Sequence, residues 1–325
     1  MITMKDIADR CGVSVMTVSR VINGSGLVSG ETRKLIMDTC KELGYIPNSA
    51  AKALVTKETN MIGLVVPDVN YYYANIIKSI SAYSDACGYG LLLCSYDHKK
   101  EKELEYLYYL LQGRVDGIIL FPIYPREDDY INIINKLPVV IANRTVSNLN
   151  TSYVGSDNYA GSVKIMEYLI EKGYKRIGAI HSDLSIESFG GRMRGYKDIL
   201  AKYGISYDDS IVFDSRLLFN EGYDYAKHMI SANVDAVFAF NDVCALGVMK
   251  YCADNDISVP GDIGVAGFDN IQYLELFDHK LTTVDYNGIL LGEQAAVVVI
   301  DEIRNPHLPK RSIILDPKLI SGKTV

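Results

Sequence analysis

The chain contains 325 residues, of which 48% are apolar and 22% charged, a composition that predicts a globular protein of about two domains. No apolar run reaches the roughly 18 residues that a membrane-spanning helix needs, so we expect no contact with a membrane. The six cysteines form no C-x-x-C pair and lie near no histidine cluster, which favours reduced thiols over a disulfide framework. We therefore expect neither a metal ion nor a cofactor.

The net charge of −7 is distributed unevenly. Residues 1–60 contain eight Lys or Arg against six Asp or Glu, whereas the rest of the chain contains 25 against 34. A mildly basic head on an acidic body indicates that nucleic acid, if it is a partner, binds the first sixty residues. The opening MITMKDIADR alternates apolar and charged residues, so we expect no signal peptide and a cytoplasmic location.

The head has the pattern of three short helices. Thr3, three residues before Asp6, forms a typical cap pair and predicts a first helix over residues 4–11. A glycine turn follows, then a second helix over 15–23 and a third over 29–43. Two short helices joined by a glycine-containing turn are the pattern of a helix-turn-helix.

The polar face of the second helix is suited to DNA. Its hydroxyl and amide side chains are short enough to hydrogen-bond phosphate oxygens. Arg20 is the one long cation of this helix and can pair with O6 and N7 of guanine in the major groove. The alternative is an ordinary solvated helix face that happens to carry an arginine.

Several motifs occur in the order found in one family: TMKDIADRCGVSVMTVSRVING, MIGLVVPDVN, YVGSDNYAG and VPGDIGVAGFDN. Over nearly its whole length the chain resembles the LacI/GalR family of bacterial transcriptional regulators. The resemblance implies that three residues of the second helix read base edges: Val15, Met16 and Arg20. It implies phosphate contacts for six further side chains: Ser14, Thr17, Ser19, Asn23, Ser29 and Thr32.

After a helix-turn-helix domain at 1–46, residues 47–59 resemble the hinge helix and linker of that family. There, two hinge helices pair over the operator centre and a leucine unstacks base pairs in the minor groove. Leu54 matches this leucine, with Ala51 and Lys52 beside it. The family usually has arginine in place of Lys52, which suits a narrow minor groove better than lysine does. An ordinary core leucine is the alternative for Leu54.

From residue 60 on, near-continuous apolar strands alternate with helical stretches, a pattern that predicts parallel sheets covered on both faces. This alternation of strands and helices occurs twice along the chain. We expect an all-α head and hinge helix followed by an α/β body, residues 60–325, of two doubly wound parallel-sheet subdomains, like the periplasmic sugar-binding proteins. Subdomain one spans about 60–158 plus 290–325, and subdomain two spans about 159–289.

Ligands of such sheets bind beyond the carboxyl ends of the strands, where this chain has polar pairs such as Asn143 and Arg144. The family resemblance implies six effector-binding residues: Tyr72, Tyr73, Arg192, Asn241, Asp269 and Tyr286. For the tyrosines, ordinary helix packing is the alternative. For Asp269 the alternative is capping of the next turn, and Asp157 is expected to cap a helix rather than bind a ligand.

The motifs of serine hydrolases, zinc proteases and P-loop enzymes do not occur, and the five histidines are isolated, so we expect no enzyme. The sequence predicts a ligand-responsive regulator, most simply a repressor, that binds a palindromic operator as a homodimer. A sugar or sugar phosphate suits the polar set best, with a nucleobase as the alternative. Whether the effector releases or strengthens DNA binding stays open.

A solute-binding protein of a transport system is the competing hypothesis. The basic head, the hinge and the opening residues argue against it. The chain also shows no heptad-bearing tail, so no coiled-coil tetramer is expected.

Overall fold

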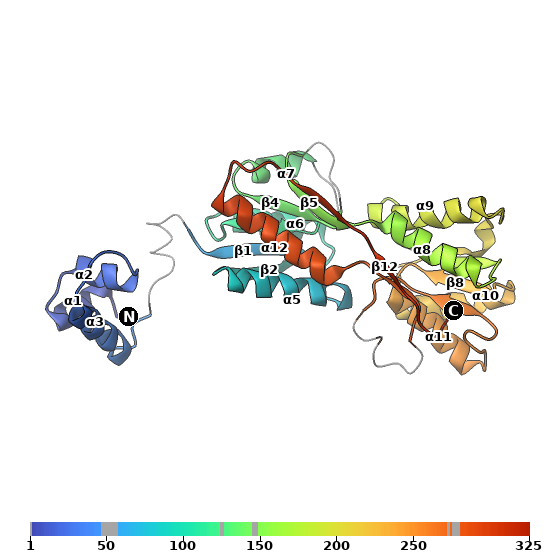
Figure 1. Cartoon of the computed structure of the whole chain (residues 1–325), viewed down its shortest axis with the longest axis horizontal. Coiled ribbons are helices and arrows are strands. Elements are labelled where there is room, and N and C mark those ends of the chain that lie inside the picture. The colour runs from blue at the N-terminus through green and yellow to red at the C-terminus, as the bar shows by residue number, and fades with distance from the viewer. Residues whose placement is uncertain (1, 47–57, 124–126, 145–148, 272–273, 275–279) are drawn as a thin grey trace. The chain divides into compact units, whose positions relative to one another are not determined.

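The computed structural model describes residues 2–46, 58–123, 127–144, 149–271, 274 and 280–325. The chain divides into two compact units, Met1–Thr59 and Asn60–Val325 (Figure 1). The hinge residues Ala51, Lys52 and Leu54 lie outside the described residues. Within the described part, no helix combines the length and the apolar character that crossing a bilayer requires.

The first unit consists of three helices: α1 (Met4–Cys11), α2 (Val15–Ile22) and α3 (Gly30–Glu42). Local chemistry fixes where each begins. Thr3 and Asp6 form the expected capping box at α1. Ser14 and Ser29 occupy the cap positions of α2 and α3, and their hydroxyls accept backbone N–H groups of the first turn. The predicted helix boundaries are therefore confirmed to within a residue.

The three helices enclose a small apolar core: Ile7, Ala8, Val18, Val21 and Ile36. Val18 and Val21 are three positions apart and so share one face of α2. With that face buried, the opposite face of α2 is left for the surface.

The second unit contains two sheets of parallel strands. The first sheet has the order β11-β5-β4-β3-β1-β2. Its strands are β1 (Met61–Val66), β2 (Gly90–Ser95), β3 (Gly117–Leu120), β4 (Val139–Ala142), β5 (Ser152–Ser156) and β11 (Ser312–Leu315). Its helices are α5 (Tyr71–Ala86), α6 (Lys100–Leu110), α7 (Glu127–Ile134) and α12 (Gly288–Arg304). We call this sheet with its helices the first lobe.

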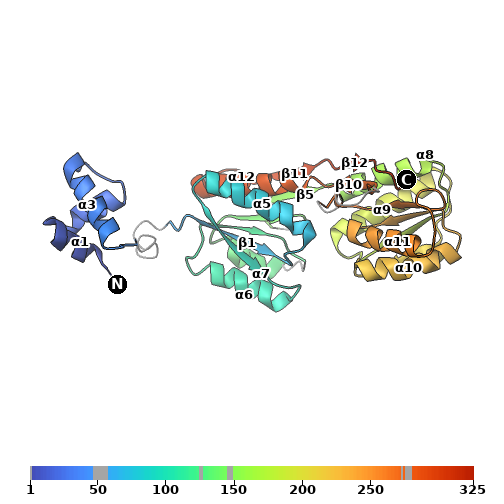
Figure 2. The ribbon, with the colours of Figure 1, turned by 90° about the horizontal axis from the view of Figure 1, so that it is seen from below.

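Helices cover both faces of the first sheet. Helices α5 and α12 pack together on one face, and α6 and α7 cover the other (Figure 2). Every residue of β3 and β4 is consequently buried. Such double burial explains why these strands are uninterrupted apolar runs in the sequence.

The second lobe contains the sheet β7-β6-β8-β9. Its strands are β6 (Ile177–His181), β7 (Val212–Asp214), β8 (Ala236–Ala239) and β9 (Gly264–Ala266). Its helices are α8 (Asn158–Glu171), α9 (Glu187–Lys202), the short 3-10 helix η1 (Asp209–Ile211), α10 (Phe219–Ser231) and α11 (Asp242–Asp254). Helices α8 and α9 pack as one pair, and α10 and α11 as another (Figure 2).

The end of the chain differs from the expectation. Strand β11 runs parallel to β5 in the first lobe, but β12 (Lys318–Ile320) pairs antiparallel with β10 (Thr283–Asp285). The Thr324 hydroxyl then donates to the Val265 carbonyl and accepts the N–H of Thr282, both buried in the second lobe. Assigning all of 290–325 to the first subdomain is therefore wrong for its last residues. They satisfy backbone groups that the short edge strand β9 leaves unpaired.

Candidate functional site

The three residues expected to read bases lie on the outer face of α2. Val15 and Met16 are 45% and 64% exposed. Arg20 is exposed one turn beyond Met16. The helix thus presents an apolar pair and a guanidinium to the outside while Val18 and Val21 hold it to the core.

The loop after α2 supports Arg20. Gly26 has a left-handed φ of 77°, and a Cβ at this position would approach Cδ of Arg20 to 3.2 Å. The N–H of Ser25 donates to the Arg20 carbonyl at 2.9 Å. A glycine here therefore lets the aliphatic part of Arg20 lie against the loop, which limits the positions that the guanidinium can take.

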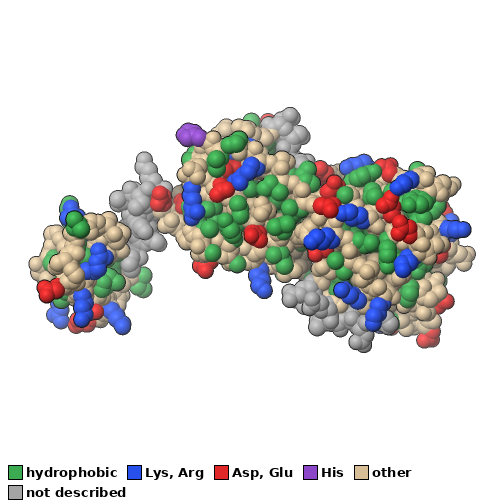
Figure 3. Space-filling model, viewed as in Figure 1, with side chains coloured by type: hydrophobic (Ala, Val, Ile, Leu, Met, Phe, Trp, Pro, Cys, Tyr) green, Lys and Arg blue, Asp and Glu red, His purple; other side chains and the backbone are tan. Residues whose placement is uncertain are grey.

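The six side chains expected at phosphates form three hydrogen-bonded pairs: Ser14 with Thr17 (2.9 Å), Ser19 with Asn23 (3.2 Å) and Ser29 with Thr32 (2.8 Å). The first and third pairs lie at the N-termini of α2 and α3. Helix N-termini attract phosphate because their first N–H groups are unpaired and the helix dipole is positive there. On the face drawn in Figure 3, Lys and Arg side chains lie on this unit beside exposed apolar side chains.

In the second unit, a cavity of about 610 Å³ lies where strands of both lobes end. Seven strand ends of the two sheets contribute a lining residue: Tyr73 after β1, Phe121 after β3, Arg144 after β4, Ser182 after β6, Leu217 after β7, Asn241 after β8 and Asp269 after β9. This is the position at which doubly wound sheets bind ligands.

Arg192, from α9, is the most enclosed cation of the cavity, with 4% of its surface exposed. Its Nε donates to Oδ1 of Asn158 at 2.9 Å, Nη1 donates to the Phe240 carbonyl, and Nη2 lies 3.4 Å from Oδ1 of Asp269. The guanidinium carbon lies 3.6 Å from the ring centroid of Phe268. Three acceptors and an aromatic face thus fix the plane of this guanidinium, and two of its five N–H groups remain for a ligand.

Asp269 follows β9 and is 8% exposed. Burial raises the pKa of its carboxyl to about 7, and Arg192 opposes that effect only in part. Asp242 lies nearby, where its carboxylate accepts the Thr283 hydroxyl at 2.5 Å and the Ile271 N–H at 2.9 Å. Burial and the neighbouring Asp269 raise the pKa of Asp242 well above its usual range. Arg192 thus pairs directly with Asp269 and affects Asp242 only through its charge.

Asn241 has a structural role in addition to lining the cavity. Its Oδ1 accepts the N–H of Cys244 at 2.8 Å and so caps α11, and its Nδ2 donates to the Leu217 carbonyl at 3.1 Å. One lone pair and one N–H of the amide remain for a ligand. Asp157 caps α8 through the N–H of Ala160, as expected.

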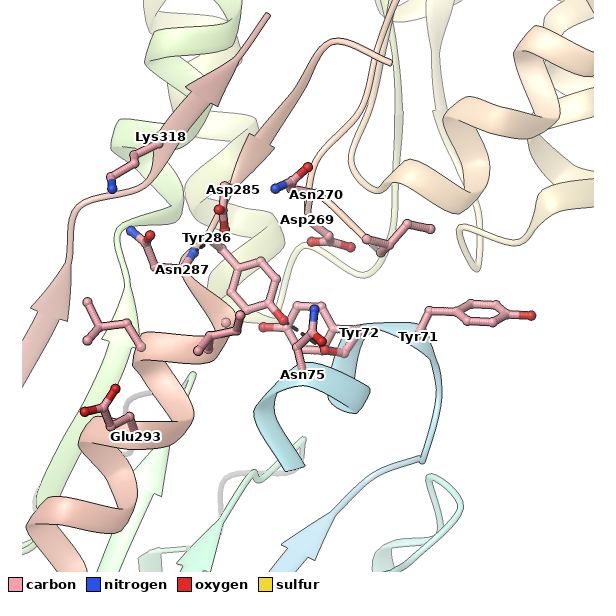
Figure 4. A pocket seen from close by; sticks show the side chains of 14 residues that line it. Tyr71, Tyr72, Asn75, Asp269, Asn270, Asp285, Tyr286, Asn287, Glu293 and Lys318 are labelled. Carbon is pink, nitrogen blue, oxygen red and sulfur yellow. Dashed lines mark hydrogen bonds between the residues drawn. The ribbon is translucent and has the colours of Figure 1, made fainter. Parts of the chain in front are cut away.

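The tyrosines divide between two cavities. Tyr73 lines the large cavity and packs edge-on against Phe121, with ring centroids 5.5 Å apart. Tyr286 instead stacks on Tyr72 at 4.5 Å and donates its hydroxyl to the Tyr72 carbonyl. These two rings line a second cavity, of about 370 Å³, which Asp269 also lines. Figure 4 shows how the side chains around this cavity lie. Of the six predicted effector residues, the structure brings five together in the large cavity, and Tyr286 packs behind Tyr72.

Arg144 is a charged, buried lining residue to which the sequence assigned no specific contact. It is 9% exposed, its Nη2 reaches the Ser185 carbonyl only at 3.4 Å, and its Nη1 has no hydrogen-bond partner among the described residues. The one signal in the sequence is its place directly after a buried strand.

Comparison with known proteins identifies both units. Residues 3–48 match the model of bacterial regulatory proteins of the lacI family, and residues 166–325 match that of a periplasmic binding protein-like domain. The HTH-type transcriptional regulator DegA of Bacillus subtilis is 32% identical, with 98% of this chain and 96% of DegA covered. The ribose operon repressor of Halalkalibacterium halodurans is 31% identical, with 100% and 97% covered.

Among solved structures, the transcriptional regulator CelR in complex with cellobiose is 27% identical, covers 100% of both chains and has a TM-score of 0.74. These similarities include the helix-turn-helix head, which favours a regulator over a transport protein. The chain belongs to the LacI family of bacterial regulatory proteins and is a sequence-specific, DNA-binding transcriptional regulator.

Proposed function

We propose that two copies of this chain bind a roughly palindromic operator in the cytoplasm, each with α2 in a major groove. We also propose that a sugar-like effector binds the cavity at the strand ends, called the cleft from here on, and changes operator affinity. The observation that carries the proposal is the exposed set of Val15, Met16 and Arg20 on a capped helix whose other face is core. The protein then acts by binding alone, without catalysis.

The chemistry of each side chain in the first unit indicates which part of the DNA it would contact. The Arg20 guanidinium offers two parallel donors, which match the two acceptors of guanine in the major groove. Val15 and Met16 offer apolar surface, which suits the methyl group of thymine. The three hydroxyl and amide pairs would fix the register on phosphates. Leu54, with Ala51 and Lys52, would enter the minor groove between the two half-sites.

The cleft supports a polyhydroxylated effector. Arg192 and Asn241 retain free donors, Asp269 offers carboxyl oxygens, and Tyr73 supplies an aromatic wall for the C–H face of a sugar ring. A volume of about 610 Å³ lies within the roughly 300–1,000 Å³ typical of small-molecule sites. The similar CelR structure contains cellobiose, which agrees with this class of ligand.

The DNA part is tested with an operator selected from a random pool and fluorescence anisotropy. Arg20→Gln should weaken binding to the selected operator about 10- to 100-fold, because a bidentate base contact contributes roughly 1–3 kcal/mol. Its binding to unrelated DNA should fall much less. Arg10→Gln is the matched control, because it removes the same charge from α1, where Arg10 makes only an exposed 3.4 Å pair with Glu42. Equal losses of Arg20→Gln on both DNAs would contradict the base-reading role.

The effector part is tested by titrating sugars into the operator complex of the full chain. A sugar that shifts operator affinity in the wild type should lose most of that effect in Arg192→Ala, with operator binding itself retained. If Arg192→Ala loses operator binding while the ligand response persists, the assignment of the cleft is wrong.

A further inference from the structure

Arg144 carries a buried charge that the described part of the chain does not satisfy. The residue follows β4 and is about nine-tenths buried. Among the described residues its Nη1 has no hydrogen-bond partner, and its Nη2 lies 3.4 Å from the Ser185 carbonyl. Burial lowers the pKa of Arg144, and Tyr130, Glu187 and Asp183 oppose that shift only in part. An arginine remains protonated in proteins, so a buried charge persists that its neighbours compensate only in part.

The N-terminus of α9 lies at the same end of the cavity. Its cap position is Ile186, whose side chain has no oxygen to accept the first N–H groups of the helix. Ile186, Ser188 and Phe189 all line the cavity together with Arg144. The Ser185 carbonyl that Arg144 reaches immediately precedes this helix. The N-terminus of the 16-residue helix α9 and the incompletely hydrogen-bonded guanidinium of Arg144 therefore lie side by side.

Two nearby carboxylates, Asp183 and Glu187, offset the buried charge of Arg144 only in part. Asp183 lines the cavity, but its Oδ1 accepts the N–H of Ser185 at 2.9 Å. Glu187 lines a separate pocket with Arg194. Arg216 at the rim is paired with Glu221 at 2.8 Å. An anionic group of a ligand could bind both the Arg144 guanidinium and the N-terminus of α9.

We propose that the effector is a hydroxylated anion, a sugar phosphate or a sugar acid, whose charged group binds Arg144 and the N-terminus of α9. This inference rests on the proposed effector function of the cleft and narrows the ligand class. Arg192, Asn241 and Asp269 hold the hydroxyl groups, whereas Arg144 selects for the charge. Phosphate and carboxylate share the acceptor geometry that a guanidinium binds through two parallel hydrogen bonds.

The first test uses inorganic phosphate as the probe and the thermal midpoint of the full chain, at constant ionic strength maintained with chloride. Phosphate should raise the midpoint of the wild type in a concentration-dependent way and should have no such effect on Arg144→Gln. Arg144→Lys keeps the charge with fewer donors and should show a reduced rise. Arg194→Gln is the matched control, because this arginine is exposed on α9 and lies outside the residues lining the cavity.

Each variant is compared with itself in the absence of phosphate, so a change in basal stability does not affect the result. A rise in the wild type and Arg194→Gln that is missing in Arg144→Gln supports the proposal. No phosphate-dependent rise in the wild type, or an equal rise in Arg144→Gln, overturns it. Equal loss in both glutamine variants would indicate general charge screening and also overturns it.

The second test compares each of several hexoses and pentoses with its phosphate and its carboxylate form, by calorimetric titration and by operator binding. The anionic forms should bind more tightly, and Arg144→Gln should weaken them at least about tenfold while leaving neutral sugars unchanged. A neutral sugar that binds as tightly as its anionic forms and alters operator affinity refutes the anionic class but leaves the proposed regulator intact. An anion that needs Arg144 but never alters operator affinity refutes the effector function and leaves the anion site.

Discussion

Replacing Arg192 with methionine removes the guanidinium from the centre of the cleft while roughly keeping its volume. Asn158 Oδ1, the Phe240 carbonyl and the Asp269 carboxyl then lose a donor in a buried place. An orphaned buried acceptor costs about 1–3 kcal/mol, and breaking a buried ion pair about 3–5 kcal/mol. The substitution also relieves the burial cost of the charge itself, so we expect a net loss of about 3 kcal/mol in the free energy of unfolding.

The pH dependence of this loss is more specific than its size. In the wild type the folded pKa of Asp269 is about 7, above the roughly 3.9 of an unfolded aspartate. Between these values the folded state keeps a proton that the unfolded state has released, so stability falls as pH rises. Above pH 7 the folded wild type releases that proton too, and this contribution becomes constant.

Without Arg192 the folded pKa of Asp269 moves higher, because Arg192 is the group that lowers it. The variant therefore continues to lose up to about 1.4 kcal/mol per pH unit above pH 7, where the wild type no longer does. The difference between the two proteins should be constant from about pH 5 to 6 and should widen from about pH 7 to 9.

Urea unfolding of both full-length proteins, followed by circular dichroism at half-unit steps of pH, measures this difference. Groups that titrate alike in both proteins cancel in the comparison. Arg192→Met combined with Asp269→Asn provides the control, because the widening should disappear when the carboxyl is gone. A difference that is flat or shrinks above pH 7, or that still widens in the double variant, would refute the assignment to Asp269.

Three further predictions concern single residues. Thr3→Ala removes the capping box with Asp6 and should cost about 1 kcal/mol, seen as several-fold faster amide exchange in α1; unchanged exchange would contradict the cap. Gly26→Ala forces alanine to a φ of 77° against Arg20 and should weaken selected-operator binding more than binding to unrelated DNA; equal effects would contradict the support of Arg20 by the loop. Without ligand, Arg144→Met should leave the thermal midpoint unchanged or raise it, because it removes an unsatisfied buried charge; a marked decrease would mean that the guanidinium is satisfied.

The features predicted best from the sequence are those that depend on neighbours within a few residues. The starts of the three head helices follow from Thr3, Ser14 and Ser29, each of which caps through a group three positions along the chain. The buried strands β3 and β4 follow from uninterrupted apolar runs. The three-residue strands β7, β10 and β12 could not be predicted in this way, because they are defined by pairing with distant segments and not by their composition.

The contacts in the cleft, by contrast, join residues that are far apart in the sequence and could not be predicted from neighbouring residues. The partners of Arg192 lie 34, 48 and 77 positions away in the sequence, so its orientation depends on how three separate segments pack. The hydroxyl of Tyr286 reaches the Tyr72 carbonyl across 214 positions, and that contact keeps it behind the cavity wall. The importance of Arg144 arises from a missing partner, which no local pattern in a sequence can indicate.

A ligand can shift the equilibrium between two arrangements of the lobes only if it binds one of them more tightly. Arg192, Asn241 and Asp269 all belong to the second lobe, so polar contacts with these three alone would not distinguish an open cleft from a closed one. Arg144 comes from the first lobe, and its hydrogen bond to the Ser185 carbonyl already reaches the second. An anion held between Arg144 and the N-terminus of α9 would bind both lobes at once and so favour the closed cleft. The contact that selects the charge of the effector would therefore also supply the difference in affinity on which a ligand-responsive regulator depends.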